Sequence, residues 1–201
     1  MLRPLNFNLS SPLSKDSLEI LKIAALRSYG ELDELQKLCS AHGHTCEYIE
    51  DPKTDGQVYI IESASYTIIA FRGTSSARDL ITDLNCIPTT TKFGLAHRGF
   101  VHAFQSIWPK IKPKVNPTKP IVVTGHSLGG ALAQLCALWI SDELKVKPAF
   151  VITFAQPRVG SFEISRRSTE IFGSRFYRLT KLLDLVPRLP PYMPCAEVEL
   201  T

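Results

Sequence analysis

The sequence lacks the long hydrophobic runs that mark membrane-spanning and secreted chains. No segment approaches the roughly 18 uninterrupted apolar residues that a membrane-spanning helix needs. The first 17 residues also hold no continuous apolar stretch like the core of a secretory signal. We therefore expect neither a leader nor a membrane span, and a chain that is cytoplasmic or exported by another route. Its compartment is otherwise unknown.

A strong charge of one sign is also missing. Lys and Arg number 23 and Asp and Glu number 19, which leaves a formal net charge of only +4. The cations are spread along the chain without a base-reading motif, so we expect no nucleic-acid partner. The most basic stretch, residues 109–120, contains four prolines and is therefore predicted to be a solvated connector rather than a lipid-binding helix.

The cysteines do not form the even set that staples a small secreted domain. They are five, at irregular spacing, which fits a reducing compartment better: Cys39, Cys46, Cys86, Cys136 and Cys195. The first two flank His42 and His44, so four potential metal ligands lie close together in the sequence. Structural zinc sites instead pair two ligands at short spacing with two more farther away. We therefore predict a helix-ending turn here and no metal.

The chain is long enough to bury a substantial core, and we expect one domain over residues 1–201. Within it, residues 1–56 are predicted to form a helical lead-in. Apolar residues recur at helical spacing over 15–28, and a second short helix is predicted over about 31–41, ending at Gly43.

Strands and helices alternate in the second half of the sequence. Before that, residues 57–63 and 66–73 are rich in β-branched and aromatic side chains and predict two strands joined by a tight turn. Helices are then predicted over 98–112, 128–144 and 161–172, and strands over 120–125, 148–155 and 175–180. This alternation predicts an α/β fold, with a mostly parallel central sheet, helices on both faces and the antiparallel pair at one end.

The stretch IVVTGHSLGGALAQL, residues 121–135, joins an apolar strand to a helix through a sharp turn at Ser127. Gly125 and Gly129 bracket this serine in a G-x-S-x-G pattern, and only glycine leaves room beside a serine thrust out on such a turn. The helix that follows directs its free amide groups at the serine, which favours developing negative charge. These features make Ser127 a candidate nucleophile. The plainer alternative is a glycine-rich turn with a helix-capping serine.

Four motifs follow one another along the chain: FRGT (71–74), GHSLGG (125–130), QPRVG (156–160) and DLVPRLPP (184–191). Over about residues 57–192, their order and rough spacing resemble the class 3 lipases, the fungal triacylglycerol-lipase-like branch of the α/β hydrolases. The resemblance implies an α/β-hydrolase fold and a serine hydrolase of carboxylic esters of lipids, of the triacylglycerol lipase or phospholipase kind, without a cofactor. It also implies a lipid ester as substrate and transient contact with a membrane or lipid-droplet surface.

Acyl transfer needs hydrogen-bond donors for the oxyanion of a tetrahedral intermediate. The backbone amide of Leu128, directly after the nucleophile, is predicted to supply one. The resemblance implies that Thr74, which ends the RGT motif, supplies a second; a turn or cap role for Thr74 is the alternative. His97 lies in a stretch that the family also has near its cleft, where this histidine either supports the site through a hydrogen bond or is purely structural.

Residues 75–84 have the pattern of a short amphipathic helix. Ala77, Leu80, Ile81 and Leu84 recur at i, i+3, i+4 and i+7, with polar side chains on the other face. In the class 3 lipases this position carries the lid, which covers the apolar cleft and opens at a lipid surface. We therefore predict a lid here. A surface helix packed permanently on the core would show the same periodicity.

Asp184 is the predicted catalytic acid. It follows the last predicted strand, at the edge where α/β sheets place functional groups. It also matches the acid of the family's motif, 57 residues after Ser127. Its role would be to orient an imidazole and stabilise the imidazolium. Asp142, within the helix after the turn, is a weaker candidate.

No histidine follows Asp184, although α/β hydrolases place the base after the acid. All the histidines precede Ser127: His42, His44, His97, His102 and His126. Either the C-terminal end of the fold that carries the base is missing, which we favour because the motifs up to LPP are intact, or the chain is a natural short form that is inactive or differently wired. Two other functions therefore stay open: a non-catalytic module that binds a lipid surface or a partner, and an acyltransferase.

Overall fold

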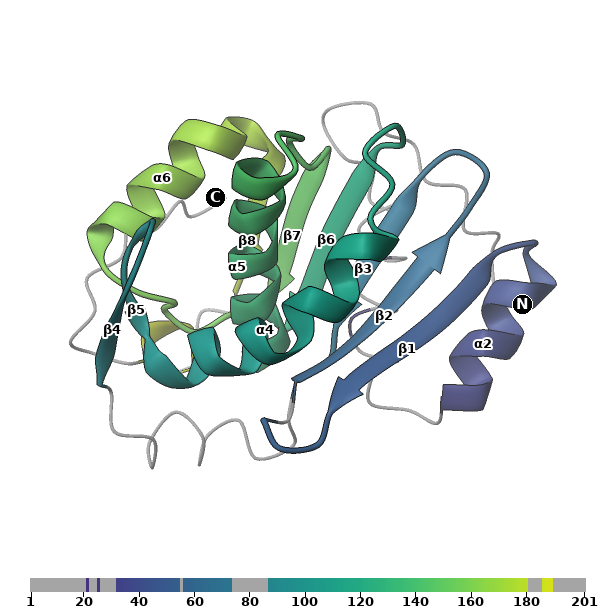
Figure 1. The fold of residues 1–201 in the computed structure, drawn as a ribbon, viewed down its shortest axis with the longest axis horizontal. Coiled ribbons are helices and arrows are strands. Elements are labelled where there is room, and N and C mark those ends of the chain that lie inside the picture. Colours follow the sequence, from purple (N-terminus) through teal and green to yellow (C-terminus); the bar gives the residue numbers. More distant parts are fainter. Residues whose placement is uncertain are drawn as a thin grey trace.

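A six-stranded sheet with the order β1-β2-β3-β6-β7-β8 forms the centre of the chain. The computed structural model describes positions 21 and 25 and the ranges 32–54, 56–73, 87–180 and 186–189, with the backbone alone for 32–34. The strands of the sheet are β1 (Thr45–Asp51), β2 (Gly56–Glu62), β3 (Thr67–Phe71), β6 (Ile121–His126), β7 (Phe150–Phe154) and β8 (Phe176–Leu179). β1, β2 and β3 pair antiparallel, whereas β3, β6, β7 and β8 are parallel neighbours (Figure 1). The predicted mostly parallel sheet with an antiparallel end is confirmed.

Helices cover both faces of this sheet. One face carries α4 (Arg98–Ile111), α5 (Leu128–Glu143) and α6 (Phe162–Phe172); in Figure 1, α4 and α5 lie in front of the strands and α6 lies to their left. On the opposite face, α2 (Leu32–Ala41) and the helical residue Leu21 pack against a second core. In the described part of the chain, no helix is both long and apolar enough to cross a membrane.

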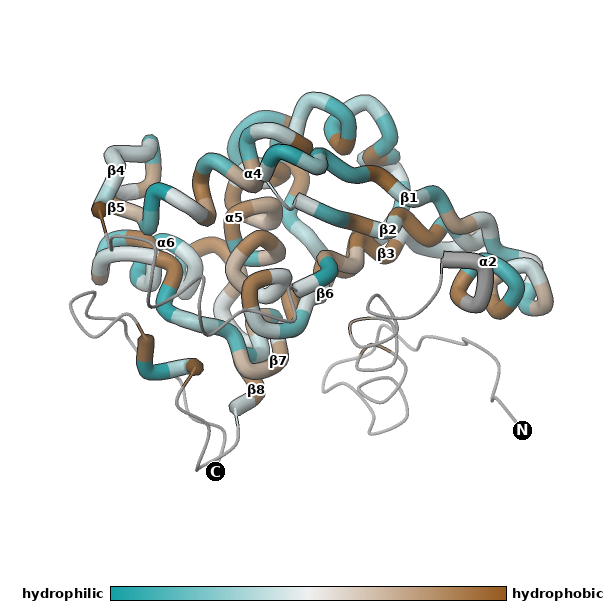
Figure 2. Tube along the Cα trace, turned by 90° about the horizontal axis from the view of Figure 1, so that it is seen from below, coloured by the Kyte–Doolittle hydropathy of each residue, from teal (hydrophilic) through white to brown (hydrophobic). Residues whose placement is uncertain are grey.

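Strand residues alternate between the two cores. Val58 and Ile60 of β2 pack on the side of α4 and α5, whereas Tyr59 and Ile61 pack on the side of α2. This period of two is expected of strands buried on both faces. All five residues of β3 are buried, as is α5 from its first residue to Ile140, and both elements are largely brown in Figure 2.

Strand β1 corrects one prediction. Residues 1–56 were expected to be a helical lead-in, but residues 45–51 form the antiparallel edge of the sheet. Two acidic side chains on this strand, Glu47 and Glu50, are exposed. An edge strand is covered on only part of its surface. The apolar pattern of β1 is therefore too short for the strand to be identified from the sequence.

A small antiparallel hairpin was also not predicted. β4 (Pro88–Thr91) and β5 (Gly94–His97) pair over four residues each and lead directly into α4. The turn is closed by the Thr91 hydroxyl, which donates to the Gly94 carbonyl at 2.7 Å and accepts from the Phe93 amide at 3.1 Å. Gly94 has a φ of 125°, a backbone conformation that L side chains rarely adopt.

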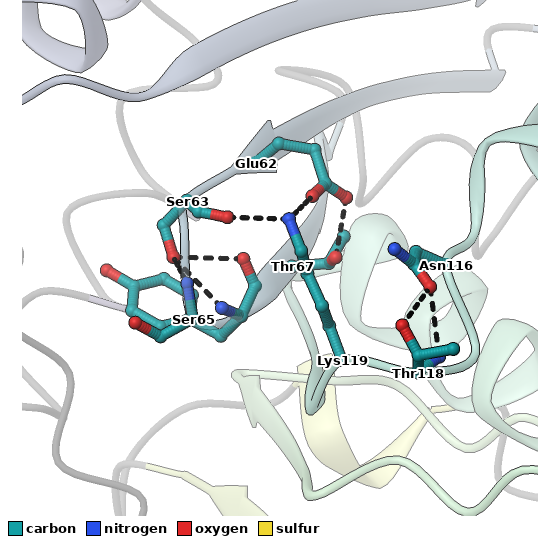
Figure 3. A network of polar contacts seen from close by, with 8 residues as sticks. Glu62, Ser63, Ser65, Thr67, Asn116, Thr118 and Lys119 are labelled. Atoms are coloured by element: carbon teal, nitrogen blue, oxygen red, sulfur yellow. Dashed lines mark hydrogen bonds and ion pairs between the residues drawn. The ribbon is translucent and has the colours of Figure 1, made fainter.

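A polar network closes the amino ends of the parallel strands (Figure 3). Ser63 Oγ accepts from the amides of Ser65 and Tyr66 at 3.1 and 3.0 Å and donates to the Tyr66 carbonyl, which fixes the turn between β2 and β3. Lys119, just before β6, donates to the Ser63 carbonyl at 2.8 Å and to the Glu62 carboxylate at 3.0 Å. The β2–β3 turn and the start of β6 are thereby held together.

Candidate active site

Ser127 occupies the turn between β6 and α5 with a strained backbone. Its φ is 54° and its ψ is −125°, a combination that non-glycine residues rarely adopt. The sequence-based prediction of a sharp strand-to-helix turn at this residue is therefore confirmed. Such strain persists only where the surrounding structure imposes it, and it occurs most often at functional sites.

Two close backbone approaches impose this turn. A Cβ on Gly125 would lie 2.2 Å from the Gly129 carbonyl oxygen, and a Cβ on Gly129 would lie 2.3 Å from the Phe71 carbonyl oxygen. Both distances are far below van der Waals contact, so any side chain here would separate β6, α5 and the end of β3. Backbone atoms that cannot move aside therefore require glycine at both of these positions, as the G-x-S-x-G pattern predicted.

The Ser127 side chain is buried and unsatisfied. The residue is 4% exposed, and its Oγ has no hydrogen-bond partner within the described part of the chain. The backbone is well anchored, because the Ser127 amide donates to the Phe154 carbonyl at 2.9 Å and its carbonyl accepts from the Gly130 amide at 2.9 Å. A buried hydroxyl without a partner costs free energy, which is expected where the hydroxyl is kept for a reaction.

Leu128 is the first residue of α5 and is 1% exposed. The first four amides of a helix have no intrahelical partner, and the helix dipole concentrates positive charge at this end. The Leu128 amide therefore lies at the positive end of the α5 dipole, directly after Ser127, and its role as a donor to an oxyanion stays a prediction.

The other predicted site residues fall outside the described residues. These are Thr74, the four lid positions Ala77, Leu80, Ile81 and Leu84, and Asp184. Asp142 lies near the end of α5 and pairs with Lys92 at 2.6 Å. Fifteen residues of helix separate it from Ser127, or about 22 Å at the usual rise per residue. The structure does not bring Asp142 to the turn.

The histidines do not pair with the nucleophile candidate. All five are described, yet Ser127 Oγ has no hydrogen-bond partner among the described residues. His97 is completely buried before α4, and its ring stacks on Phe100 with centroids 4.3 Å apart. Among the described residues, the candidate site thus holds a serine but no base within hydrogen-bonding distance of its Oγ.

A buried polar chain connects α5 to the loop that follows β7. Gln134 of α5 donates to Ser168 Oγ of α6 at 2.8 Å and accepts a hydrogen bond from Gln156. Gln134 and Gln156 are 4% and 1% exposed. Because amides so deeply buried are stable only when hydrogen-bonded, this chain fixes the loop relative to both helices.

Arg178 of β8 extends the chain toward the segment after the predicted acid. Its Nη2 donates to the carbonyl oxygens of Gln156 and Pro187 at 2.8 and 2.7 Å. The Arg158 amide donates to the Leu189 carbonyl at 2.7 Å. These bonds attach residues 186–189 to the loop after β7.

The sequence patterns alone did not identify Gln134, Gln156 or Arg178. The available signal was a single glutamine among the apolar and glycine residues of 128–140, together with the glutamine that begins QPRVG. A small cavity of about 50 Å³ lies beside this polar chain. Its lining includes Gln134, Gln156, Arg158 and Arg178 but not Ser127, and it is too small for an ester substrate.

No metal centre is evident in the described ranges, which contain no group of three or more His, Cys, Asp or Glu side chains placed to hold an ion. The residues 39–46, predicted to form a helix-ending turn, comprise the end of α2, a turn and the start of β1.

Comparisons with known proteins agree with the geometry of the Ser127 turn. The family model described as "Lipase (class 3)" matches residues 68–193. The chain is 31% identical over 167 residues to "Lipase ZK262.3" of Caenorhabditis elegans, covering 78% of this chain and 47% of that protein. It is 35% identical over 133 residues to secreted mono- and diacylglycerol lipase 1 of Fusarium solani, covering 62% of this chain and 39% of that protein. The chain spans less than half the length of these relatives.

Solved structures show the same fold. Lipase II from Rhizopus niveus is 26% identical, with a TM-score of 0.70 over 87% of this chain and 72% of that one. The Rhizomucor miehei lipase in complex with its propeptide is 24% identical, with a TM-score of 0.74 over 92% of this chain and 68% of that one. The predicted α/β-hydrolase fold is confirmed by these likenesses.

Proposed function

The chain belongs to the class 3 lipase family, and on this premise we propose that it carries the nucleophile of a serine hydrolase that cleaves carboxylic esters of lipids. The observation that carries the proposal is the Ser127 turn. A serine is held at a φ of 54° by two glycines that cannot bear a Cβ, and its buried Oγ has no partner among the residues that the structure describes. A structural serine gains nothing from such a position.

The proposed reaction begins with attack of Ser127 Oγ on the ester carbonyl. The Leu128 amide, at the first position of α5, stabilises the oxyanion that forms. Thr74 supplies a second donor and Asp184 orients the imidazole that removes the serine proton. Gly125 and Gly129 keep the turn sharp enough to present the hydroxyl.

The substrate class is proposed from the relatives. The printed names include a mono- and diacylglycerol lipase from Fusarium solani and a lipase from Rhizomucor miehei. For this chain we propose glycerides or other long-chain esters presented at a membrane or lipid-droplet surface, with residues 75–84 acting as a lid.

The described residues do not place a catalytic base beside Ser127 Oγ. Because every histidine of the sequence precedes Ser127 and none hydrogen-bonds its Oγ, the proposal requires an imidazole delivered by rearrangement of an upstream histidine or by residues outside this sequence.

The proposal is tested by covalent labelling. The chain is treated with a fluorophosphonate ester, in which Ser127 Oγ bonds to phosphorus and fluoride leaves, and its intact mass is measured. We expect one adduct that is absent from Ser127→Ala and retained in Ser63→Ala, whose hydroxyl lies at the opposite end of the strands. Release of fatty acid from a monoacylglycerol emulsion by the same three proteins then checks the substrate class.

A second candidate function is favoured by one observation, that none of the five histidines, all of which the structure describes, hydrogen-bonds Ser127 Oγ. In that case the shell binds a lipid surface without cleaving it. It predicts no adduct on a folded chain, and equal binding of the wild-type chain and Ser127→Ala to lipid vesicles. That pair of results would overturn the hydrolase proposal.

A further inference from the structure

Two cysteine thiols meet where α2 ends and β1 begins. Cys39 of α2 is fully buried, whereas Cys46, the second residue of β1, is half-buried. Both are free thiols, and their side chains hydrogen-bond to each other. They contact the core on the α2 side of the sheet, which is the face opposite α5.

The backbone holds this pair together independently of the sulfur contact. The His44 amide donates to the Cys39 carbonyl at 2.9 Å, which closes the turn after α2. Gln36, one helical turn before Cys39, donates from its side-chain amide to the Cys46 carbonyl at 3.3 Å. Since β1 is also fixed by its pairing of Cys46 with Ile61, both backbone segments that carry the two thiols are held in place.

The environments of the two thiols give them different roles. The hydrogen bond from Cys46 lowers the pKa of Cys39 against the opposing effect of burial, and the same bond raises the pKa of Cys46. Cys46 is the one that a solute can reach, because Cys39 has no exposed surface. The reachable thiol therefore reacts first and slowly, and the buried one is suited to resolve the product.

We propose that Cys39 and Cys46 form an intramolecular disulfide by exchange with a small-molecule disulfide such as oxidised glutathione. The Cys46 thiolate attacks one glutathione sulfur, forming a mixed disulfide and releasing the first glutathione thiolate. The Cys39 thiolate then attacks the Cys46 sulfur and releases the second. Both protein thiols lose their protons, two molecules of reduced glutathione form, and the oxidant is consumed in equal amount.

This bond links α2 covalently to the edge strand of the sheet. It does not depend on the proposed hydrolase function, because neither cysteine lies at the Ser127 turn. It also changes what the odd number of cysteines implies: a local pair exists whichever state the other three are in. The closed loop of eight residues is short, so we expect oxidation to raise the melting temperature by about 5 °C.

The test is peptide mass spectrometry after oxidation. The folded chain is incubated with oxidised glutathione, remaining thiols are alkylated in denaturant, and the protein is digested with trypsin. Both cysteines fall in one tryptic peptide, Leu38–Lys53, because no Lys or Arg lies between its ends. We expect this peptide without alkyl groups and lighter by two hydrogen atoms, returning to two alkyl groups after reduction.

Matched variants separate this pair from other thiols. Cys46→Ala is expected to lose the oxidised peptide and the rise in melting temperature, while Cys136→Ala, which removes a lone buried thiol, keeps both. A wild-type peptide that carries two alkyl groups after oxidation would overturn the proposal. So would a peptide joined to another one through Cys86 or Cys195.

Discussion

The two ends of the parallel strands treat buried polar groups differently. At the amino ends, Ser63 and Lys119 make several hydrogen bonds that tie the β2–β3 turn to β6. At the carboxyl ends, Ser127 Oγ and Thr153 Oγ1 are buried without a partner in the described part of the chain. The carboxyl ends also hold the hydrogen-bonded chain through Gln134, Gln156 and Arg178, but among the described residues they alone combine a strained backbone at Ser127 with an unsatisfied hydroxyl on the group proposed to react.

The same contrast runs along α5. Its first turn is packed against β3 and β6 so closely that Gly129 admits no side chain. At its far end, Glu143 accepts hydrogen bonds from Lys92, Lys112 and Trp108. The helix is therefore held by a charged cluster at the end away from the candidate nucleophile.

The largest expected effect is that of Gly129→Ala. The new Cβ would lie 2.3 Å from the Phe71 carbonyl oxygen, so we expect a loss of about 3 kcal/mol or more in the free energy of unfolding. The control is Gly130→Ala on the same helical turn, whose Cβ would lie 3.0 Å from the Gln156 Cβ and 3.3 Å from the Gly125 carbonyl oxygen. These contacts are looser than the one at Gly129, and alanine favours the helix, so its loss of unfolding free energy should be clearly smaller than that of Gly129→Ala. Urea unfolding compares the two, and equal losses would contradict the close backbone approach.

Ser63→Ala weakens the hydrogen-bonded network at the amino ends of the parallel strands. It leaves the amides of Ser65 and Tyr66 without their side-chain acceptor, so we expect a loss of about 1 to 2 kcal/mol. Thermal unfolding measures the effect, with Ser165→Ala, a half-buried serine on α6, as the control for removal of a hydroxyl. A neutral Ser63→Ala would show that the turn does not depend on this network.

Glu143→Gln tests the charged end of α5 through its pH dependence. Burial alone would raise the pKa of Glu143, but hydrogen bonds from Lys112, Trp108 and Lys92 lower it from 4.5 to about 2. A lowered folded-state pKa stabilises the fold above the ordinary value, and that stabilisation is lost as the pH falls toward 2. We expect the variant to lose roughly 1 kcal/mol at pH 7, allowing for partial solvent screening.

Unfolding of Glu143→Gln and of the wild-type chain is then followed from neutral pH downward. The difference between them should shrink as the carboxyl of the wild-type chain becomes protonated. A difference that stays constant with pH would assign the loss to packing instead of charge.

The sequence predicted the parts of the molecule that depend on local pattern. The strands β2, β3, β6 and β7 and the helices α4, α5 and α6 follow from apolar periodicity, and the turn at Ser127 follows from its two glycines. β1 was not predicted because exposed acidic side chains interrupt its apolar pattern. The hairpin β4–β5 was not predicted because strands of four residues are too short to show a hydrophobic period.

The polar chain through Gln134, Gln156 and Arg178 could not be predicted from the sequence. Its members come from α5, from the loop after β7 and from β8, and only the tertiary fold brings them together. The roles of Thr74 and Asp184 rest on the motifs alone, because both lie outside the described residues. The part of the candidate site formed by a local motif, the Ser127 turn, could thus be predicted. The part that depends on packing between distant segments could not.

The smallest expected effect is also the most direct test of the contrast between the two ends. In Ser127→Gly, the residue at a φ of 54° becomes one that adopts this backbone readily, and the variant loses a buried hydroxyl that has no partner in the described ranges. We predict a gain of about 1 kcal/mol in the free energy of urea unfolding, together with loss of the fluorophosphonate adduct. If Ser127→Gly instead destabilised the chain as much as Ser63→Ala does, Ser127 would be a structural residue, and the account of a strained nucleophile would be contradicted.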